Sequence, residues 1–267
     1  MSMHSGSSPF PRPGTDLGAL DLNVSPEAND RYWGGAGIDH PLRHAGWLFP
    51  PMAVNLSILL IQQTVPDGVL HTWGRVRCHA AARAGCALTI TGRVQDRFEK
   101  RERDYFVVAS QIAADDGTLL WSSELELAAS RRRPGAGGQG GPERPRAYEP
   151  DPAASVVARR LTLGADLLRA YSRAGNFHSD DASARSMGLP GMTAMGMQTL
   201  GPAIGVLADA WGPDLLSRGE TEVRFFGLVL EDDTVEVEIR RAGDAATVGV
   251  RNVTKDLHTA AGRIALV

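Results

Sequence analysis

The stretch Tyr171–Met197, YSRAGNFHSDDASARSMGLPGMTAMGM, decides how the whole chain is interpreted. It places one histidine, His178, in a polar loop between two short helix-like runs, and a turn rich in proline and glycine follows. A longer apolar helix is then expected at about 194–210. A polar loop aimed at a helix N-terminus suits a developing negative charge, because the first N–H groups of a helix are free. We therefore expect a functional site around His178.

The composition is that of an ordinary globular chain. It has 267 residues, of which 43% are hydrophobic and 22% charged, and its net charge is -3. This charge gives no reason to expect nucleic acid or a membrane surface as a partner. The two cysteines, Cys78 and Cys86, lie in strand-like runs without metal-ligand spacing, so we expect free packed thiols, no metal and no cofactor. No apolar run approaches the roughly 18 residues that span a bilayer, and no secretory signal is evident, so a soluble cytoplasmic protein is predicted.

Two segments rich in glycine and proline divide the chain. The N-terminus contains much Ser, Pro and Gly, and the block RRRPGAGGQGGPERPR, from Arg131, has no hydrophobic face to pack. The second segment fits a mobile linker better than a phosphate-binding patch. The predicted boundaries are a disordered arm over 1–20, an N-terminal domain over 21–130, a linker over 131–155 and a C-terminal domain over 156–267.

Both domains show the same order of elements, namely a helical entry, one longer apolar helix and a run of strands. In the first domain, prolines before an apolar run predict a buried helix near 51–63. Alternation and turn signals predict strands near 69–80, 86–99, 103–114, 118–129, 217–230, 233–241, 246–255 and 258–266. Each helix would be wrapped by a curved antiparallel sheet, and edge-to-edge pairing of the two sheets would create a shared cleft.

The residues also repeat between the domains. Arg31 stands nine residues before His40, and Arg169 stands nine residues before His178. Together with the shared order of elements, this register indicates an internal duplication.

The pattern resembles the MaoC-like, or hydratase-2, branch of the hotdog superfamily. The motif of that branch reads approximately S-G-D-x-N-P-x-H-x-D, then A-x-x-x-G, then P-x-x-H-G-M. The matching residues are Ser172, Asn176, His178, Asp180, Ala184, Gly188, Pro190, Gly196 and Met197. Residues Gly37, Asp39, His40, Pro41, Gly46, Pro50 and Pro51 look like the degenerate N-terminal hotdog of two-domain members. The resemblance implies an α+β double hotdog, with two tandem antiparallel sheets each wrapped around a central helix, and acyl-CoA or acyl-carrier thioesters as substrates.

The departures from the motif bear on the chemistry. The acidic residue of S-G-D falls on Arg173 or Ala174, the proline after the asparagine is replaced by Phe177, and Met195 replaces the histidine of H-G-M. In the hydratases of this branch, Asp and His together activate the water that adds to the double bond. Half of that apparatus is therefore missing from its usual position.

His178 is the main catalytic candidate, because its near-neutral pKa suits proton transfer. Asn176 either orients a water or the histidine, or caps the turn. Asp180 is a weaker catalytic candidate and is most simply the N-cap of a short helix. Backbone N–H groups of Gly196 and Met197 could bind the thioester oxygen, although glycines there also allow close packing.

Five further residues are expected near the substrate. Tyr171 and Arg173 would face the cleft, where Arg173 could hold a carboxylate or phosphate. In the first domain, Asp39 and His40 either supply the missing acid or are remnants, and remnants are favoured slightly. Asn55, the polar residue early in the helix near 51–63, is either buried with a partner or reaches the ligand.

Three functions fit these residues. A thioesterase needs a positioned water, one base and an oxyanion site, and it is favoured narrowly. An enoyl-CoA hydratase or 3-hydroxyacyl dehydratase needs a second acid or base. A non-catalytic acyl-thioester-binding subunit would bind without turnover. The acyl group is not predicted, and both a monomer and a homodimer fit the sequence.

Overall fold

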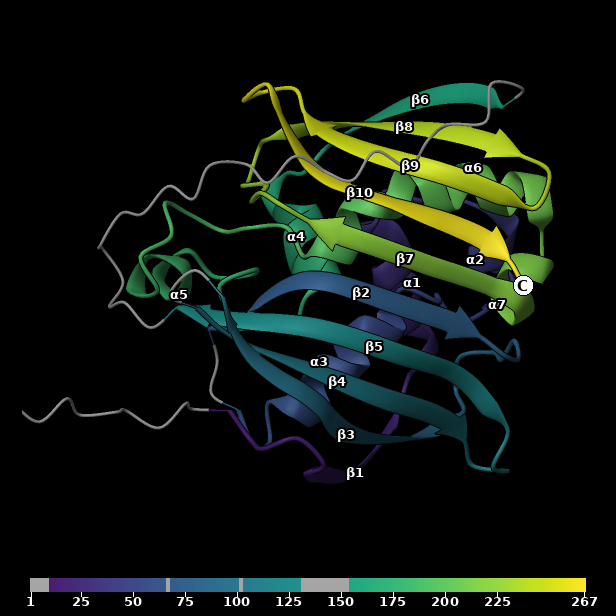
Figure 1. Cartoon of the computed structure of the whole chain (residues 1–267). Coiled ribbons are helices and arrows are strands. Elements are labelled where there is room, and N and C mark those ends of the chain that lie inside the picture. The colour runs from purple at the N-terminus through teal and green to yellow at the C-terminus, as the bar shows by residue number, and fades with distance from the viewer. Residues whose placement is uncertain (1–9, 66–67, 101–102, 131–153) are drawn as a thin grey trace, which may run out of the picture.

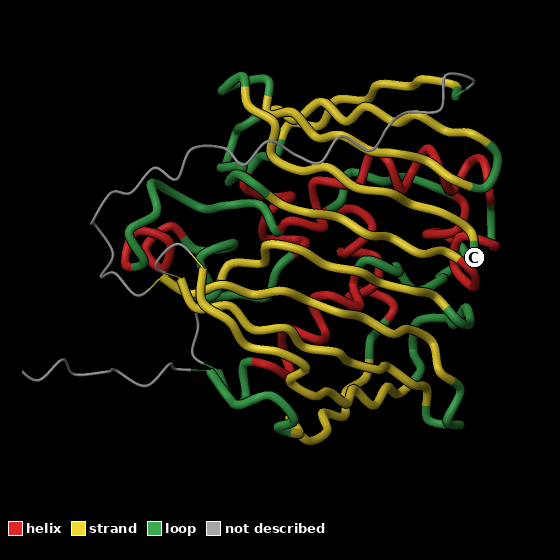
Figure 2. Tube along the Cα trace, viewed as in Figure 1, coloured by secondary structure: helices red, strands yellow, loops and turns green. Residues whose placement is uncertain are grey.

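Ten antiparallel strands form one continuous sheet, and most of the helices lie together on one face of it, while the short helix over 181–186 lies apart at one side (Figure 1, Figure 2). The computed structural model describes residues 10–65, 68–100, 103–130 and 154–267. The strands are β1 (Asp16–Asn23), β2 (Leu70–Cys78), β3 (Ala87–Lys100), β4 (Arg103–Ala114), β5 (Leu119–Ser130), β6 (Ser155–Thr162), β7 (Gly219–Phe225), β8 (Thr234–Ala242), β9 (Ala245–Asn252) and β10 (Leu257–Leu266). The helices are α1 (Pro26–Gly35), α2 (Pro41–His44), α3 (Met52–Ile61), α4 (Ala165–Tyr171), α5 (Asp181–Ser186), the 3-10 helix η1 (Gly196–Leu200), α6 (Gly201–Trp211) and α7 (Asp214–Arg218).

The strand order has an internal symmetry. It reads β1-β3-β4-β5-β2-β7-β10-β9-β8-β6, so each strand of the first half has a counterpart at the mirrored place in the second. The halves meet where β2 pairs with β7, from Trp73 opposite Arg224 to Arg77 opposite Glu220. This topology agrees with the duplication inferred from the sequence, and it joins the two expected sheets edge to edge.

The central helix α3 forms from the expected apolar run and is buried on most of its surface. Eight of its ten residues are buried, as expected for a helix that is hydrophobic all round. Its buried Ser57 donates to the carbonyl of Ala53 at 2.8 Å, so its oxygen accepts from the hydroxyls of Ser110 at 2.6 Å and Ser123 at 3.0 Å. No helix in the described ranges is long and apolar enough to cross a membrane.

Two expected boundaries differ from the structure. β1 begins at Asp16, inside the segment predicted as a disordered arm, because the strand pairs with β3 across a bulge between Asp16 and Ala19. Its short, partly charged sequence with Gly18 in the left-handed region resembles a loop when it is read without its partner. β6 begins at Ser155, the last residue of the predicted linker, whereas 131–153 lie outside the described residues.

The two halves also approach each other closely through glycines. A Cβ atom at Gly35 would lie 2.7 Å from the backbone nitrogen of Tyr171, and one at Gly201 would collide with the carbonyl of Ala36. Gln198 spans this contact, since its side-chain nitrogen donates to the carbonyls of Gly35 at 2.8 Å and Leu167 at 2.9 Å. Only glycine permits this spacing between α1 and α4.

We expect Gly35→Ala to lower the free energy of unfolding by about 1–3 kcal/mol, because overpacking forces the two helices apart. Without that contact, alanine would stabilise the helix relative to glycine. Urea denaturation measures the change. Gly249→Ala is the matched control, because a Cβ at Gly249 meets nothing within 4 Å, and equal losses in the two variants would contradict this explanation.

Candidate functional site

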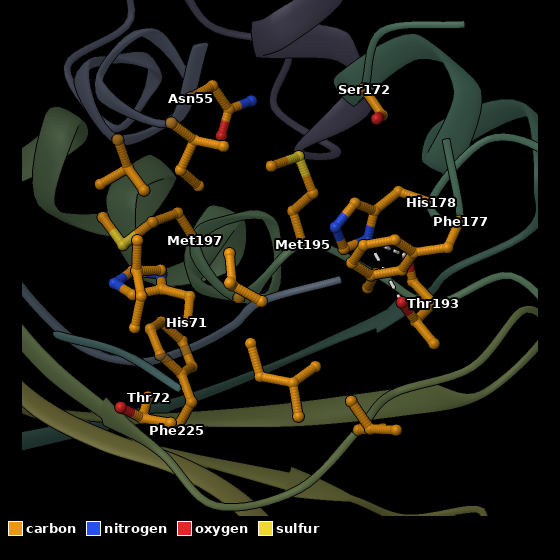
Figure 3. Close-up of a pocket in the computed structure, with 18 of the residues that line it drawn as sticks. Asn55, His71, Thr72, Ser172, Phe177, His178, Thr193, Met195, Met197 and Phe225 are labelled. Carbon is orange, nitrogen blue, oxygen red and sulfur yellow. Dashed lines mark hydrogen bonds between the residues drawn. The ribbon is translucent and has the colours of Figure 1, made fainter. Parts of the chain in front are cut away.

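A pocket of about 330 Å³ lies between the two halves and is lined by both (Figure 3). The first half contributes α3 residues such as Asn55 and the start of β2 with His71. The second half contributes the loop around His178, the segment that leads into η1, and the chain that follows β7. The pocket therefore depends on the pairing of β2 with β7.

The loop that carries His178 is ordered by Asn176. The side-chain oxygen of Asn176 accepts hydrogen bonds from the backbone N–H of His178 at 2.9 Å and from the Ser172 hydroxyl at 3.0 Å. Gly175, in the left-handed region with φ 78°, makes the preceding turn. Asn176 thus holds the loop in shape, which is one of the roles expected from the sequence.

His178 is held by Thr193. Its Nδ1 lies 2.8 Å from the backbone carbonyl oxygen of Thr193 and 3.2 Å from the Thr193 hydroxyl. Burial lowers the pKa of His178 to about 4, against a smaller opposing effect of the bond to the Thr193 backbone. The ring is therefore neutral at pH 7, and Nδ1 donates to Thr193. The ring edge toward Met195 carries Nε2, which is left as a proton acceptor (Figure 3).

Thr193 is itself fixed by a buried acid. It forms a bridge with Leu230, whose backbone N–H donates to the Asp233 carboxylate at 2.7 Å. Asp233 is 3% exposed and also accepts from Asn252 at 2.8 Å and Lys255 at 2.6 Å. The charge of Asp233 is compensated within this cluster, so the carboxylate serves to position the wall of the pocket and not to transfer protons.

The start of η1 provides free backbone donors beside the pocket. Met195 precedes the helix without a side-chain cap, and Gly196 and Met197 are its first residues. A Cβ at Gly196 would lie 2.7 Å from the ring of Phe225, so glycine is required by packing as well. The geometry is compatible with both roles expected for Gly196. Its N–H can bind the thioester oxygen, because the first N–H groups of a helix lack intrahelical partners, and its missing side chain allows the close packing against Phe225.

Three residues expected as acid or base candidates, Asp180, Asp39 and His40, do not line the pocket. Asp180 accepts from the N–H of Ser183 at 2.7 Å, and this bond lowers its pKa, so it caps α5 outside the pocket. Asp39 pairs with His44 at 2.7 Å on the surface. His40 accepts from the N–H of Leu42 and lies 3.3 Å from Asp209. Among the described residues that line the pocket, none is aspartate or glutamate.

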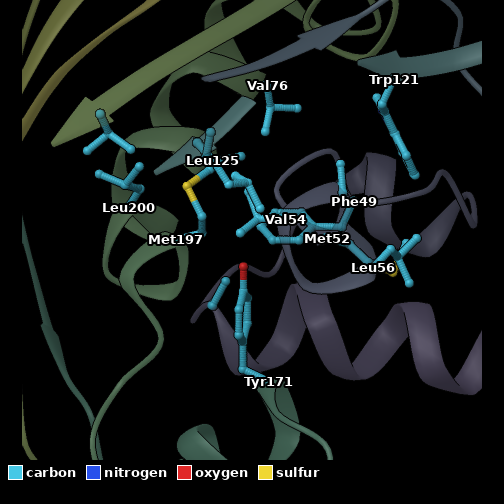
Figure 4. Close-up of a cluster of buried hydrophobic side chains, with 14 of the residues drawn as sticks. Phe49, Met52, Val54, Leu56, Val76, Trp121, Leu125, Tyr171, Met197 and Leu200 are labelled. Atoms are coloured by element: carbon cyan, nitrogen blue, oxygen red, sulfur yellow. The ribbon is translucent and has the colours of Figure 1, made fainter. Parts of the chain in front are cut away.

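Tyr171 differs from expectation, because it lies in the hydrophobic core and not along the pocket (Figure 4). Its side chain is fully buried, and its ring contacts those of Tyr32 and Phe49 edge-on, with centroids 5.4 Å and 6.2 Å apart. Arg173 and Asn55 do line the pocket, as expected.

Several pocket residues were missed by the sequence analysis, among them Thr193, His71 and Tyr32. His71, at the start of β2, packs its ring against Phe225 at 4.9 Å, and burial lowers its pKa to about 4. Tyr32, in α1, lines the same pocket. A β-bulge between His71 and Trp73 sets which face His71 occupies, and simple alternation along the strand does not reveal such a bulge. No group of three His, Cys, Asp or Glu side chains in the described part of the chain could hold a metal ion.

Comparison with known proteins identifies the fold. Residues 171–262 match the family described as MaoC like domain, and no curated protein matches the chain. Full-length peroxisomal multifunctional enzyme type 2 from Drosophila melanogaster superposes with a TM-score of 0.73 at 19% identity, over 93% of this chain and 48% of that chain. This chain therefore spans about half the length of that enzyme.

Two further structures match over nearly their whole length. A MaoC-like dehydratase from Phytophthora capsici has a TM-score of 0.72 at 14% identity, over 95% of each chain. A conserved Mycobacterium tuberculosis protein, described as having a double hotdog fold, has a TM-score of 0.67 at 15% identity, over 96% of each chain. The predicted double hotdog is confirmed.

The two half-buried histidines of the pocket wall predict a pH-dependent stability. The pKa of each falls from 6.5 to about 4 on folding, so the unfolded chain binds more protons between these values. The free energy of unfolding should therefore decrease as the pH falls from about 6.5 toward about 4. Urea denaturation of wild type and His71→Phe across this range tests this, and the variant should show a shallower decrease. The exposed-site control His258→Gln should match wild type, and identical slopes for wild type and His71→Phe would contradict the role of His71.

Proposed function

The chain is a double hotdog whose second half carries a MaoC-like domain, and on this premise we propose that it hydrolyses acyl thioesters. The observation that carries the proposal is the composition of the pocket wall. It holds a neutral histidine and the start of a helix, while the described lining residues include no carboxylate. Hydrolysis needs one base and one oxyanion site.

In the proposed reaction, Nε2 of His178 accepts a proton from a water molecule as the water oxygen attacks the thioester carbonyl carbon. Negative charge collects on the carbonyl oxygen, where the N–H groups of Gly196 and Met197 stabilise it. The tetrahedral intermediate then breaks its C–S bond, and His178 returns the proton to the departing sulfur. The products are a carboxylic acid and a free thiol. Asn176 and Thr193 hold His178 in place and take no part in proton transfer.

Basic side chains support a thioester with a phosphate-bearing arm. Arg103 and Arg173 line the same pocket, one from each half. Arginine binds phosphate oxygens through several N–H groups at once. Both coenzyme A and the prosthetic arm of an acyl-carrier protein carry phosphate, so either form of the substrate fits this proposal.

A hydratase or dehydratase is the second candidate, favoured by the match of residues 171–262 to the MaoC like domain. Addition of water to an enoyl thioester requires removal of a proton from water and delivery of a proton to the α-carbon. Of the aspartate and histidine that the hydratase motif uses for these two proton transfers, this chain has the histidine, His178, at the pocket, and no aspartate is among the described lining residues. The missing acid weighs against this candidate. A non-catalytic binding subunit requires neither step.

Turnover of CoA esters distinguishes these functions. The protein is incubated with octanoyl-CoA and with 2-octenoyl-CoA, and thiol release and enoyl absorbance are followed separately. We expect thiol release from octanoyl-CoA. Loss of enoyl absorbance without thiol release would overturn the thioesterase in favour of the hydratase, and silence in both channels would favour the binding subunit.

Replacement of His178 tests the base. We expect His178→Ala to lower kcat about 10²–10⁴-fold, as is typical for loss of a general base. In wild type, kcat/KM should fall as the pH drops through about 4, because protonation of His178 removes the acceptor. His258→Ala, at an exposed position on β10, should retain full activity. Full activity in His178→Ala would remove His178 from the mechanism.

A further inference from the structure

Phe177 lies directly against the imidazole ring of His178. The centroids of the two rings are 3.9 Å apart, and the ring planes meet at 40°. Both residues line the pocket and both are half-buried. Figure 3 shows the two rings side by side, next to Thr193. Aromatic pairs usually have centroids about 4.5–7 Å apart, so this contact is a close one, and no water molecule fits between the rings.

The position of Phe177 is set by its backbone. The N–H of Thr193 donates to the carbonyl of Phe177 at 3.3 Å, and Nδ1 of His178 lies 2.8 Å from the carbonyl oxygen of Thr193. The two segments are therefore tied to each other in both directions. Asn176, which accepts from the N–H of His178, holds the preceding turn. None of these bonds uses the phenyl ring, so a substitution can remove the ring while the loop keeps its hydrogen bonds.

The imidazole of His178 is thus held at one edge and on one face. Thr193 holds the edge that carries Nδ1, through its carbonyl oxygen at 2.8 Å and its hydroxyl at 3.2 Å. The outer torsion of a histidine side chain has broad minima, so contacts at one edge leave the ring able to tilt. The phenyl ring of Phe177 restricts this tilt, because it packs on the face of the imidazole.

The residue type at position 177 fits this role. The MaoC-like motif has a proline after its asparagine, and a proline restricts the backbone through its fixed φ angle. In this chain the hydrogen bonds of Asn176 and Thr193 already hold the backbone of the loop. Phe177 supplies a large flat side chain instead, and that side chain covers His178.

From these contacts we infer that Phe177 is a positioning residue for the proposed base: it holds the ring of His178 with Nε2 toward the pocket and keeps water off one face of the ring. Phe177 acts through His178 and takes no part in proton transfer. The inference rests on the proposed function for its kinetic consequence, whereas its effect on the His178 ring can be measured without turnover.

Exclusion of water disfavours the protonated ring, because an imidazolium ion loses hydration that a phenyl ring does not replace. Burial is the main cause that lowers the pKa of His178 to about 4, and no charged side chain contributes to this shift. The other titratable residues among the described lining residues are Arg173 in the same loop, Arg103 on β4, His71 on β2 and Tyr32 on α1. None of them is an acid that would favour the imidazolium form.

NMR titration of the His178 ring tests the inference directly, with the signal assigned by its loss in His178→Ala. The pKa of about 4 should rise in Phe177→Ala by about one unit or more, toward the unperturbed value of about 6.5, because water reaches the uncovered face. Phe177→Leu should retain most of the lowering, since leucine is also apolar. Phe98→Ala is the matched control, because Phe98 is half-buried, stacks on Tyr105 at 5.1 Å and does not line the pocket. It should leave the pKa of His178 unchanged.

The pH profile of thiol release gives a second readout. At pH 5 a base with a pKa of about 4 is mostly unprotonated, whereas a base whose pKa is one unit higher is about half protonated. The ratio of kcat/KM at pH 5 to kcat/KM at pH 8 should therefore fall about two-fold or more in Phe177→Ala. It should stay close to the wild-type ratio in Phe177→Leu and Phe98→Ala.

An unchanged or lower pKa of His178 in Phe177→Ala would overturn the inference, and so would an equal rise in Phe98→Ala. If Phe177→Ala does not fold, Phe177→Gln decides by the same criterion, because it places a polar amide against the same face. Absence of thiol release by wild type would overturn the proposed function, and the NMR titration still decides the role of Phe177.

Discussion

The pairing of β2 with β7 is the interaction on which the site depends. It joins two duplicated halves into one sheet and brings α3 of the first half to the loop that carries His178. Neither half encloses the pocket alone, because Asn55, Tyr32 and His71 come from one and His178 and Gly196 from the other. The close approach of Gly35 to Tyr171 fixes the same junction from the helical side. The first half is therefore a structural part of the site even though its own motif is degenerate.

The chemistry follows from what surrounds the histidine. Burial keeps His178 neutral, and Thr193 directs its proton so that Nε2 is free to accept another. Asp233 fixes Leu230 and hence Thr193, yet it lies within a compensated cluster of its own. The protein thus uses its buried carboxylate for positioning. A single neutral base facing a helix start is the minimum needed for hydrolysis, and this is why we favour that reaction.

Most of the architecture could be predicted from the sequence, because alternation and proline punctuation are local signals. The helix near 51–63 and eight strands were found close to their observed bounds. The two edge strands, β1 and β6, were missed because an edge strand gains its order from its single partner, β3 for β1 and β8 for β6. In the site, the positions of His178 and Asn55 were anticipated, while Tyr171 was misplaced because an aromatic beside a loop gives no sign of which way it packs. His71 was missed because its orientation depends on a bulge, and Tyr32 because its neighbour Asn55 is distant in sequence.

A crystal structure with a non-hydrolysable ligand tests the account most directly. A suitable ligand is an S-(2-oxoalkyl)-CoA, in which a methylene separates the sulfur from the carbonyl carbon. The account predicts that the carbonyl oxygen lies within hydrogen-bond distance of the N–H of Gly196 or Met197, with the carbonyl carbon facing Nε2 of His178 and the alkyl chain running toward Asn55. A carbonyl group bound away from both His178 and the start of η1 would contradict it.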